Sequence, residues 1–132
     1  MEQAVLRDWM WADGRGPELQ RVYYVRSQLR ALEYLNPDWR SEADVRHLLF
    51  DRTQVSMFTP EEVHNYADGG IKWGPTIDQA AVVNLGRSNW LLSFAQLHLE
   101  RCSHYRLMFY DEFLDVICEG ISAGQGPYPQ KG

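Results

Sequence analysis

The chain has 132 residues and carries 13 Lys and Arg against 18 Asp and Glu, a formal net charge of −5. Apolar residues make up 45% and charged residues 23%, which is typical of folded globular proteins and excludes a disordered chain. At this length we expect one domain. The longest apolar runs are far shorter than the ~20 residues that a membrane-spanning helix needs. The acidic balance argues against nucleic acid as a partner, since phosphate binding usually requires a basic surplus.

The start of the chain carries no basic segment followed by an apolar run, so we expect no signal peptide. The two cysteines, Cys102 and Cys118, are too few for a disulfide framework. We therefore expect a cytoplasmic protein in which both residues are thiols.

Helix signals dominate the first half of the chain. Residues 4–11 are predicted to be helical, and Gly14-Arg15-Gly16 then breaks the chain. Pro17 is a favourable first helical residue, and apolar residues at steps of three and four predict an amphipathic helix over 17–35. The residue before Pro37 avoids the helical region, which ends this helix. A further helix is predicted over 41–50.

The second half of the chain shows similar signals. Capping boxes at Thr59/Glu62 and Thr76/Gln79 predict helices over 59–67 and 76–85. Ser88 is expected to open a helix over 88–98, and another is predicted over 111–120. Only 55–58 and 107–110 favour extended structure, as short connectors that pair with each other. The predicted fold is therefore all-α, with six to seven helices in one domain over 1–123 and a flexible Gly/Pro tail over 124–132.

Two stretches of the chain share one layout. In Phe58-Thr59-Pro60-Glu61-Glu62-Val63 and Met108-Phe109-Tyr110-Asp111-Glu112-Phe113-Leu114, a large apolar residue precedes a Glu by four and an apolar residue follows it. An apolar segment and a loop precede each stretch. This layout resembles the EF-hand, a helix, a twelve-residue loop and a second helix. The resemblance implies two packed helix-loop-helix units, as in EF-hand-like domains of cytoskeletal and ciliary proteins.

Neither loop has the ligands for calcium. Calcium needs six to eight oxygen ligands and a glycine at the sixth loop position, where the first loop has Ser56 and the second has Arg106. Arg101 stands at the first ligand position of the second loop and would oppose a cation. We therefore predict an EF-hand-like pair that does not bind calcium.

Signals for catalysis and metal binding are weak. Cys102 and His104 form the only close Cys/His pair, and two ligands do not hold a structural zinc ion. The acidic pairs Glu61-Glu62 and Asp111-Glu112 lie in predicted first helical turns, where the helix dipole explains them. We predict no catalytic residue, no cofactor and no metal.

Aromatic residues are the more informative class, at 13% of the chain. Trp9 and Trp11 point to different faces of the predicted helix, and Trp73 lies in a glycine-rich loop. Tyr128 stands between prolines in the tail. A rigid ring in such places often anchors a partner, although it can equally seal a small core. We predict Trp9, Trp11, Trp73 and Tyr128 as partner-binding residues, and we assign Trp90, Phe94 and Phe113 to the core.

Three functions remain open from the sequence. The first is a non-catalytic protein–protein interaction module, a structural or adaptor subunit of an assembly that the EF-hand-like resemblance implies is cytoskeletal or axonemal. The second is an acidic inhibitor or immunity-type protein that blocks the basic site of an effector. The third is a small enzyme that uses Cys102, His104 and a carboxylate. We favour the first, with another protein as partner and neither membrane nor nucleic acid.

Overall fold

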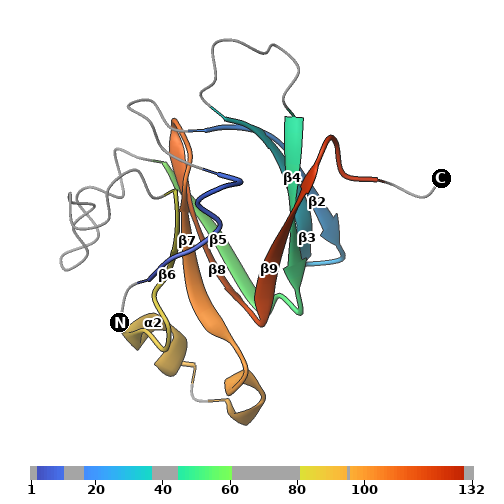
Figure 1. Ribbon diagram of the computed structural model, residues 1–132. Helices are drawn as coiled ribbons and strands as arrows, with labels where there is room; N and C mark the ends of the chain where they lie inside the picture. The colour runs from blue at the N-terminus through green and yellow to red at the C-terminus, as the bar shows by residue number, and fades with distance from the viewer. Residues whose placement is uncertain (1–2, 11–16, 37–44, 61–80, 95, 130–132) are drawn as a thin grey trace.

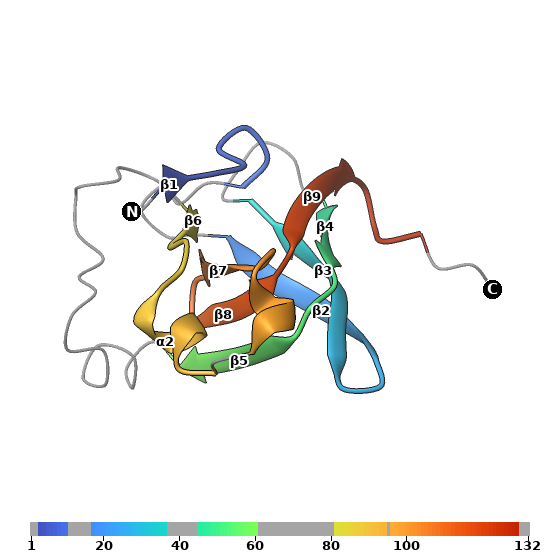
Figure 2. The same ribbon diagram turned by 90° about the horizontal axis from the view of Figure 1, so that it is seen from below.

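Two antiparallel β-sheets form the body of the protein. The computed structural model describes residues 3–10, 17–36, 45–60, 81–94 and 96–129. Within them, five strands in the order β1-β6-β7-β8-β5 make one sheet and four in the order β2-β3-β4-β9 make the other. The two sheets meet at an angle and enclose the core (Figures 1 and 2).

The elements are short and nearly all are strands. In chain order they are β1 Gln3–Ala4, β2 Glu18–Val25, β3 Gln28–Leu35, β4 Val45–Asp51, β5 Val55–Pro60, β6 Val82–Asn84, helix α2 Asn89–Leu92, the 3-10 turn η1 Leu97–Leu99, β7 Ser103–Met108, β8 Glu112–Cys118 and β9 Gly120–Gln125. In the described ranges no helix is long and apolar enough to cross a membrane.

Two continuous chain segments pass from one sheet to the other. Strand β4 pairs with β9 as far as Asp51↔Gly120, and β5 pairs with β8 from Val55↔Ile117. Between these ladders, the Glu119 N–H donates to the Asp51 carbonyl, at an N···O distance of 2.8 Å. The two sheets therefore meet at this corner, where a backbone hydrogen bond joins the two connecting segments, and their apolar sides face each other.

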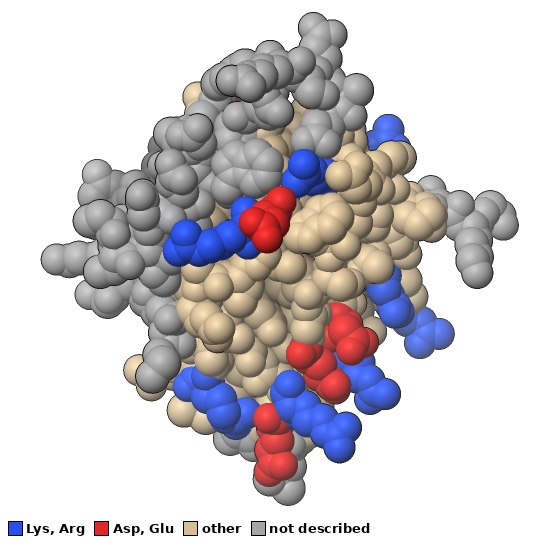
Figure 3. Space-filling model, in the orientation of Figure 1, with Lys and Arg blue, Asp and Glu red and all other residues tan. Residues whose placement is uncertain are grey.

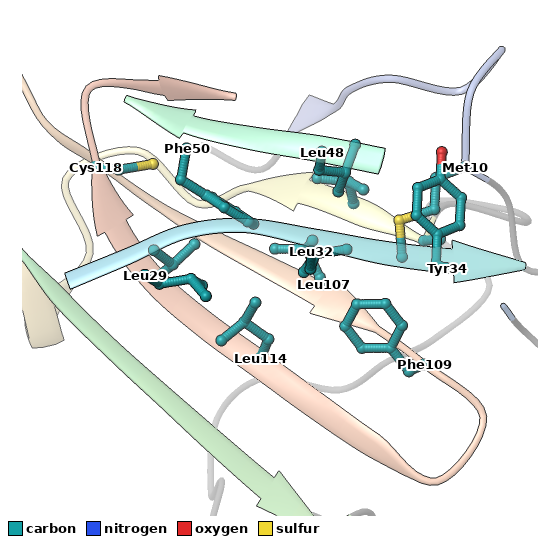
Figure 4. Close-up of a cluster of buried hydrophobic side chains, with 13 residues drawn as sticks. Met10, Leu29, Leu32, Tyr34, Leu48, Phe50, Leu107, Phe109, Leu114 and Cys118 are labelled. Atoms are coloured by element: carbon teal, nitrogen blue, oxygen red, sulfur yellow. The ribbon is translucent and has the colours of Figure 1, made fainter. Parts of the chain in front are cut away.

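The main core fills the space between the sheets. Figure 4 shows its central side chains, contributed by β3, β4, β7, β8 and the segment before residue 11. Fully buried members include Leu32, Leu48, Leu107 and Leu114. A smaller cluster of Leu91, Leu99, Cys102 and Ile117 lies on the outer face of the five-stranded sheet, beneath α2 and η1.

The predicted helix over 17–35 is wrong, because the segment forms the β2–β3 hairpin. Val25 pairs with Gln28, and Arg26 takes the positive φ of 58° that a two-residue hairpin loop demands. The apolar spacing has a structural cause. A register shift leaves Arg30 as an additional residue in β3, so Leu29 and Leu32 both reach the core although they are three apart. The bulge thus gives the apolar residues of this strand the spacing of three and four that is typical of a helix.

The all-α prediction and the EF-hand-like pair fail together. Residues 112–118 form β8, in which six of seven residues are buried. A strand that is buried on both faces shows no alternation of apolar and polar residues. The acidic residues at its start resemble the first turn of a helix. The helix predicted over 41–50 is wrong as well, because residues 45–51 form β4, and residues 103–108, expected within the second loop, form β7. The described residues therefore contain no helix-loop-helix unit, and Glu62 lies outside them.

Some local predictions are confirmed. Residues 55–58 are extended within β5, but they do not pair with residues 107–110, because β8 lies between β5 and β7. Ser88 is the N-cap of a helix, although α2 ends after four residues. Gly124 and Gln125, assigned to the tail, belong to β9. The helices predicted over 59–67 and 76–85 are wrong where the structure describes them, because residues 59–60 end β5 and residues 82–84 form β6, while residues 61–80 lie outside the described residues.

Candidate functional site

Strand β2 forms one edge of the four-stranded sheet. It pairs with β3 on one side, and no described strand pairs with its other side. Its sequence, Val22-Tyr23-Tyr24-Val25, consists of residues that favour strands. Val22, Tyr24 and Val25 nevertheless expose 37%, 46% and 49% of their surface. An edge strand that exposes apolar residues, as β2 does in its second half, can accept a strand from another chain.

Two clefts lie at the opposite ends of the β2–β3 hairpin and carry different charges. A cleft of about 250 Å³ at the start of β2 is lined by Glu18, Asp111 and Glu112 among others. Burial, helped by the neighbouring Asp111, raises the pKa of Glu112. A cleft of about 420 Å³ at the other end is lined by Arg30, Arg52 and Asp51 among others. The charged residues of the first cleft are therefore all acidic, whereas those of the second are two arginines and one aspartate.

Elsewhere on the surface the charges are mixed. On the face in Figure 3, basic and acidic side chains are interspersed over a large uncharged area. At the sheet corner, the Arg52 Nε lies 3.8 Å from a Glu119 carboxylate oxygen. The polarity of the hairpin ends is therefore a local feature.

A buried polar network lies on the outer face of the five-stranded sheet. His104 and Arg106 are two apart on β7 and share one face, and Asp115 stands opposite Arg106 on β8. His104 Nε2 and Arg106 Nε each donate to the same Asp115 oxygen at 2.7 Å. The Ser88 hydroxyl lies 2.7 Å from His104 Nδ1. His104 and Asp115 are each only 2% exposed.

This Ser–His–Asp order resembles a proton relay. A carboxylate only accepts, so Nε2 carries a proton, and in the neutral ring Nδ1 accepts from Ser88. The Ser88 oxygen, however, also caps α2 by accepting the Leu91 N–H. The Trp90 ring packs against the imidazole at a centroid distance of 4.8 Å. These contacts hold the buried imidazole between the sheet and the α2 segment.

The electrostatics of Asp115 agree with a structural role. Burial raises the pKa of this carboxyl, but the hydrogen bonds from His104 and Arg106 outweigh burial and leave the pKa below its usual value. The ionised form is therefore held in place by two donors. Removal of any one member of such a buried ion cluster leaves an uncompensated charge and strongly lowers the free energy of unfolding.

The predicted Cys102–His104–carboxylate set is divided between two environments. His104 does find a carboxylate, Asp115, but Cys102 belongs to the apolar cluster of Leu91 and Leu99. Both cysteines are free and buried. Burial raises the pKa of Cys102, and it raises that of Cys118 to about 12, so neither thiol is activated. Within the described residues no group of three His, Cys, Asp or Glu could hold a metal ion.

Two of the four predicted anchors lie within the described residues. The half-buried Trp9 tethers the N-terminal segment, because its carbonyl accepts from the Tyr34 hydroxyl and the Asn36 amide, each at 2.7 Å. Tyr128 packs its ring on Tyr23 at 4.9 Å. Trp11 and Trp73 lie outside the described residues. Partner binding by these four residues stays a prediction.

Neither the β2 edge nor the buried polar network was predicted from the sequence. Val22-Tyr23-Tyr24-Val25 carries a strand signal that the helical period obscured. His104 and Arg106 alternate with Tyr105 and Leu107, which is a strand pattern with one polar face. Their carboxylate partner was assigned to a helix, so the pairing could not be expected.

Comparisons with protein-family models, with curated proteins and with solved structures found no match to this chain.

Proposed function

We propose that the protein is a non-catalytic, cytoplasmic protein–protein interaction module, an adaptor or structural subunit that binds an extended segment of its partner along β2. The observation that carries the proposal is the eight-residue edge strand, which exposes apolar residues in its second half and has no described strand on its outer side. Added strands gain affinity from backbone hydrogen bonds and specificity from alternate side chains.

The charges at the ends of the hairpin define the partner. The exposed Arg26 and the Arg30–Arg52 cleft lie at one end of the edge, and the cleft of Glu18, Asp111 and Glu112 lies at the other. A complementary segment therefore has apolar residues at its centre, an acidic residue facing the Arg30 end and a basic residue facing the Glu18 end. Such complementarity fixes the direction of an added strand and favours encounter.

Edge-blocking variants test the proposal. Tagged wild-type chain and the variant Val22→Lys/Tyr24→Lys are compared in affinity capture from the native source. Lysine on an edge strand resists strand addition, so we expect at least a tenfold loss of the specific partner. Leu92→Lys, on α2, removes an apolar side chain that is equally exposed at 50%, and should leave capture unchanged.

A second measurement locates the contact. With the identified partner bound, the amides of residues 18–25 should exchange more slowly with solvent, whereas those of α2 should not change. Equal capture by wild type and the double-lysine variant contradicts the proposal, as does protection confined to another strand.

A further inference from the structure

The chain after β9 returns to the outer face of the four-stranded sheet. Glu33 on β3 and His47 on β4 are cross-strand partners there, and they are only 7% and 8% exposed. The Tyr128 N–H donates to Glu33 Oε2 at 2.7 Å, and the Tyr23 hydroxyl donates to the same oxygen at 2.9 Å. The Gly126 carbonyl lies 3.0 Å from His47 Nδ1, which must donate because a carbonyl only accepts.

These contacts use chemistry that another chain can supply. The segment contributes one backbone N–H, one backbone carbonyl and an aromatic ring, which lies 4.9 Å from Tyr23 and 6.3 Å from His47 between centroids. Pro127 and Pro129 flank the ring and restrict the backbone, which lowers the entropy lost on binding. Within this chain, the sheet therefore binds a segment in which two prolines flank an aromatic residue.

The sheet has a shaped place for these partners. Gly124 on β9 stands opposite His47, and a Cβ at this position would overlap the imidazole ring. Only a glycine here lets His47 lie flat over β9 with Nδ1 directed at the Gly126 carbonyl. The name "Tyr23 slot" is used below for Tyr23, Glu33, His47 and Gly124.

We propose that the Tyr23 slot is a peptide-recognition site for Pro-aromatic-Pro segments, occupied in cis by residues 126–129 and opened when a partner segment of the same chemistry displaces them. The attached segment competes at an effective concentration on the order of millimolar. A ligand that binds the slot weakly therefore cannot displace the cis segment, whereas a ligand that binds more tightly can. The proposal rests on the outer face of the sheet and does not depend on strand addition at the β2 edge.

A peptide titration tests it on the full-length chain. The probe is a fluorescent, end-capped peptide with the sequence of residues 125–130, Gln-Gly-Pro-Tyr-Pro-Gln, and the readout is fluorescence polarisation. The variant Tyr128→Ala weakens the cis segment by one aromatic contact, so we expect it to bind the probe about two to ten times more tightly than wild type does. A probe with Ala in place of Tyr should bind to neither protein.

Matched variants assign the binding to the slot. Tyr23→Ala in the Tyr128→Ala background should abolish probe binding, whereas Leu92→Ala, at an exposed position on α2 outside both proposed sites, should preserve it. Equal affinity of wild type and Tyr128→Ala overturns the proposal, and so does failure of a natively folded Tyr128→Ala chain to bind. Should Tyr128→Ala not fold, millimolar probe is titrated into the wild type. Shifts of the Tyr23 and His47 NMR signals then support the slot, and unchanged signals overturn it.

Discussion

Each sheet carries a buried histidine and a buried carboxylate on its outer face, and the two pairs are satisfied in different ways. On the five-stranded sheet, His104 and Asp115 bond directly to each other and are closed in by Ser88 and Trp90. On the four-stranded sheet, Glu33 and His47 each bond to the segment after β9. The first pair is completed by residues of the five-stranded sheet and the α2 segment, and the second by the segment after β9. Under the proposal above, the buried polar groups stabilise the fold on one face and bind a displaceable segment on the other.

The sharpest test of this contrast is Asp115→Asn. Two donors, His104 Nε2 and Arg106 Nε, lose a charged acceptor in a site that excludes water. We expect a loss of about 3–5 kcal/mol in the free energy of unfolding, measured with urea at neutral pH. Glu119→Gln, which removes only the exposed partner of Arg52, should cost less than about 1 kcal/mol. A loss below 1 kcal/mol for Asp115→Asn would show that the network does not hold α2 on the sheet.

The contribution of the Asp115 carboxylate to the free energy of unfolding should depend on pH. Because the pKa of Asp115 is lowered in the folded state, its contribution is complete above the ordinary pKa of about 4. That contribution is lost as pH falls through the lower folded pKa. Unfolding free energies measured from pH 7 to pH 2 should therefore fall more steeply for wild type than for Asp115→Asn.

Glu112→Gln provides a control of opposite sign. The pKa of Glu112 is raised, so its carboxyl favours the folded state at low pH and this contribution is lost as pH rises through the folded pKa. The variant should therefore gain stability relative to wild type as pH rises. Parallel pH profiles for wild type and Asp115→Asn would contradict the role given to the network.

Gly124→Ala tests the other pair. The new methyl group displaces the His47 ring and breaks its hydrogen bond to the Gly126 carbonyl. Overpacking of this kind typically costs about 1–3 kcal/mol, and the segment after β9 should become accessible to proteases. Ser122→Ala, on the same strand at an exposed position, serves as the control. Equal stability and equal cleavage in the two variants would refute the shaped slot.

The sequence predicted some local features correctly but not those that depend on strand pairing. Features within a few residues were recoverable, such as the Ser88 cap and the extended character of 55–58. The β2–β3 hairpin was not, because the bulge at Arg30 produced a helical period that only strand pairing explains. Strand β8 could not be predicted either, because a strand buried on both faces lacks the alternation of apolar and polar residues.

The candidate sites depended on those missed strands. His104 and Asp115 are eleven residues apart and meet only because β7 and β8 pair, and Glu33 meets Tyr128 across 95 residues. The sequence predicts Tyr128 as a partner-binding residue, and this stays a prediction, because the structure shows only that its ring packs on Tyr23 of the same chain. A residue's capacity for contact was thus visible in the sequence, whereas the surface that receives it was not.

The smallest expected effect concerns that same tyrosine. Tyr128→Ala removes one half-buried aromatic contact with Tyr23 but keeps the backbone N–H that bonds to Glu33. Aromatic pairs contribute about 0.5–1.5 kcal/mol, so urea unfolding should report a loss in this range, while Tyr24→Ala should stay within about 0.5 kcal/mol of wild type. The loss should also be local, with fast amide exchange confined to residues after β9, because no core side chain depends on the segment. Global loosening in Tyr128→Ala comparable with that of Asp115→Asn would mean that both faces are structural, and the distinction between a fixed pair and a displaceable one would fail.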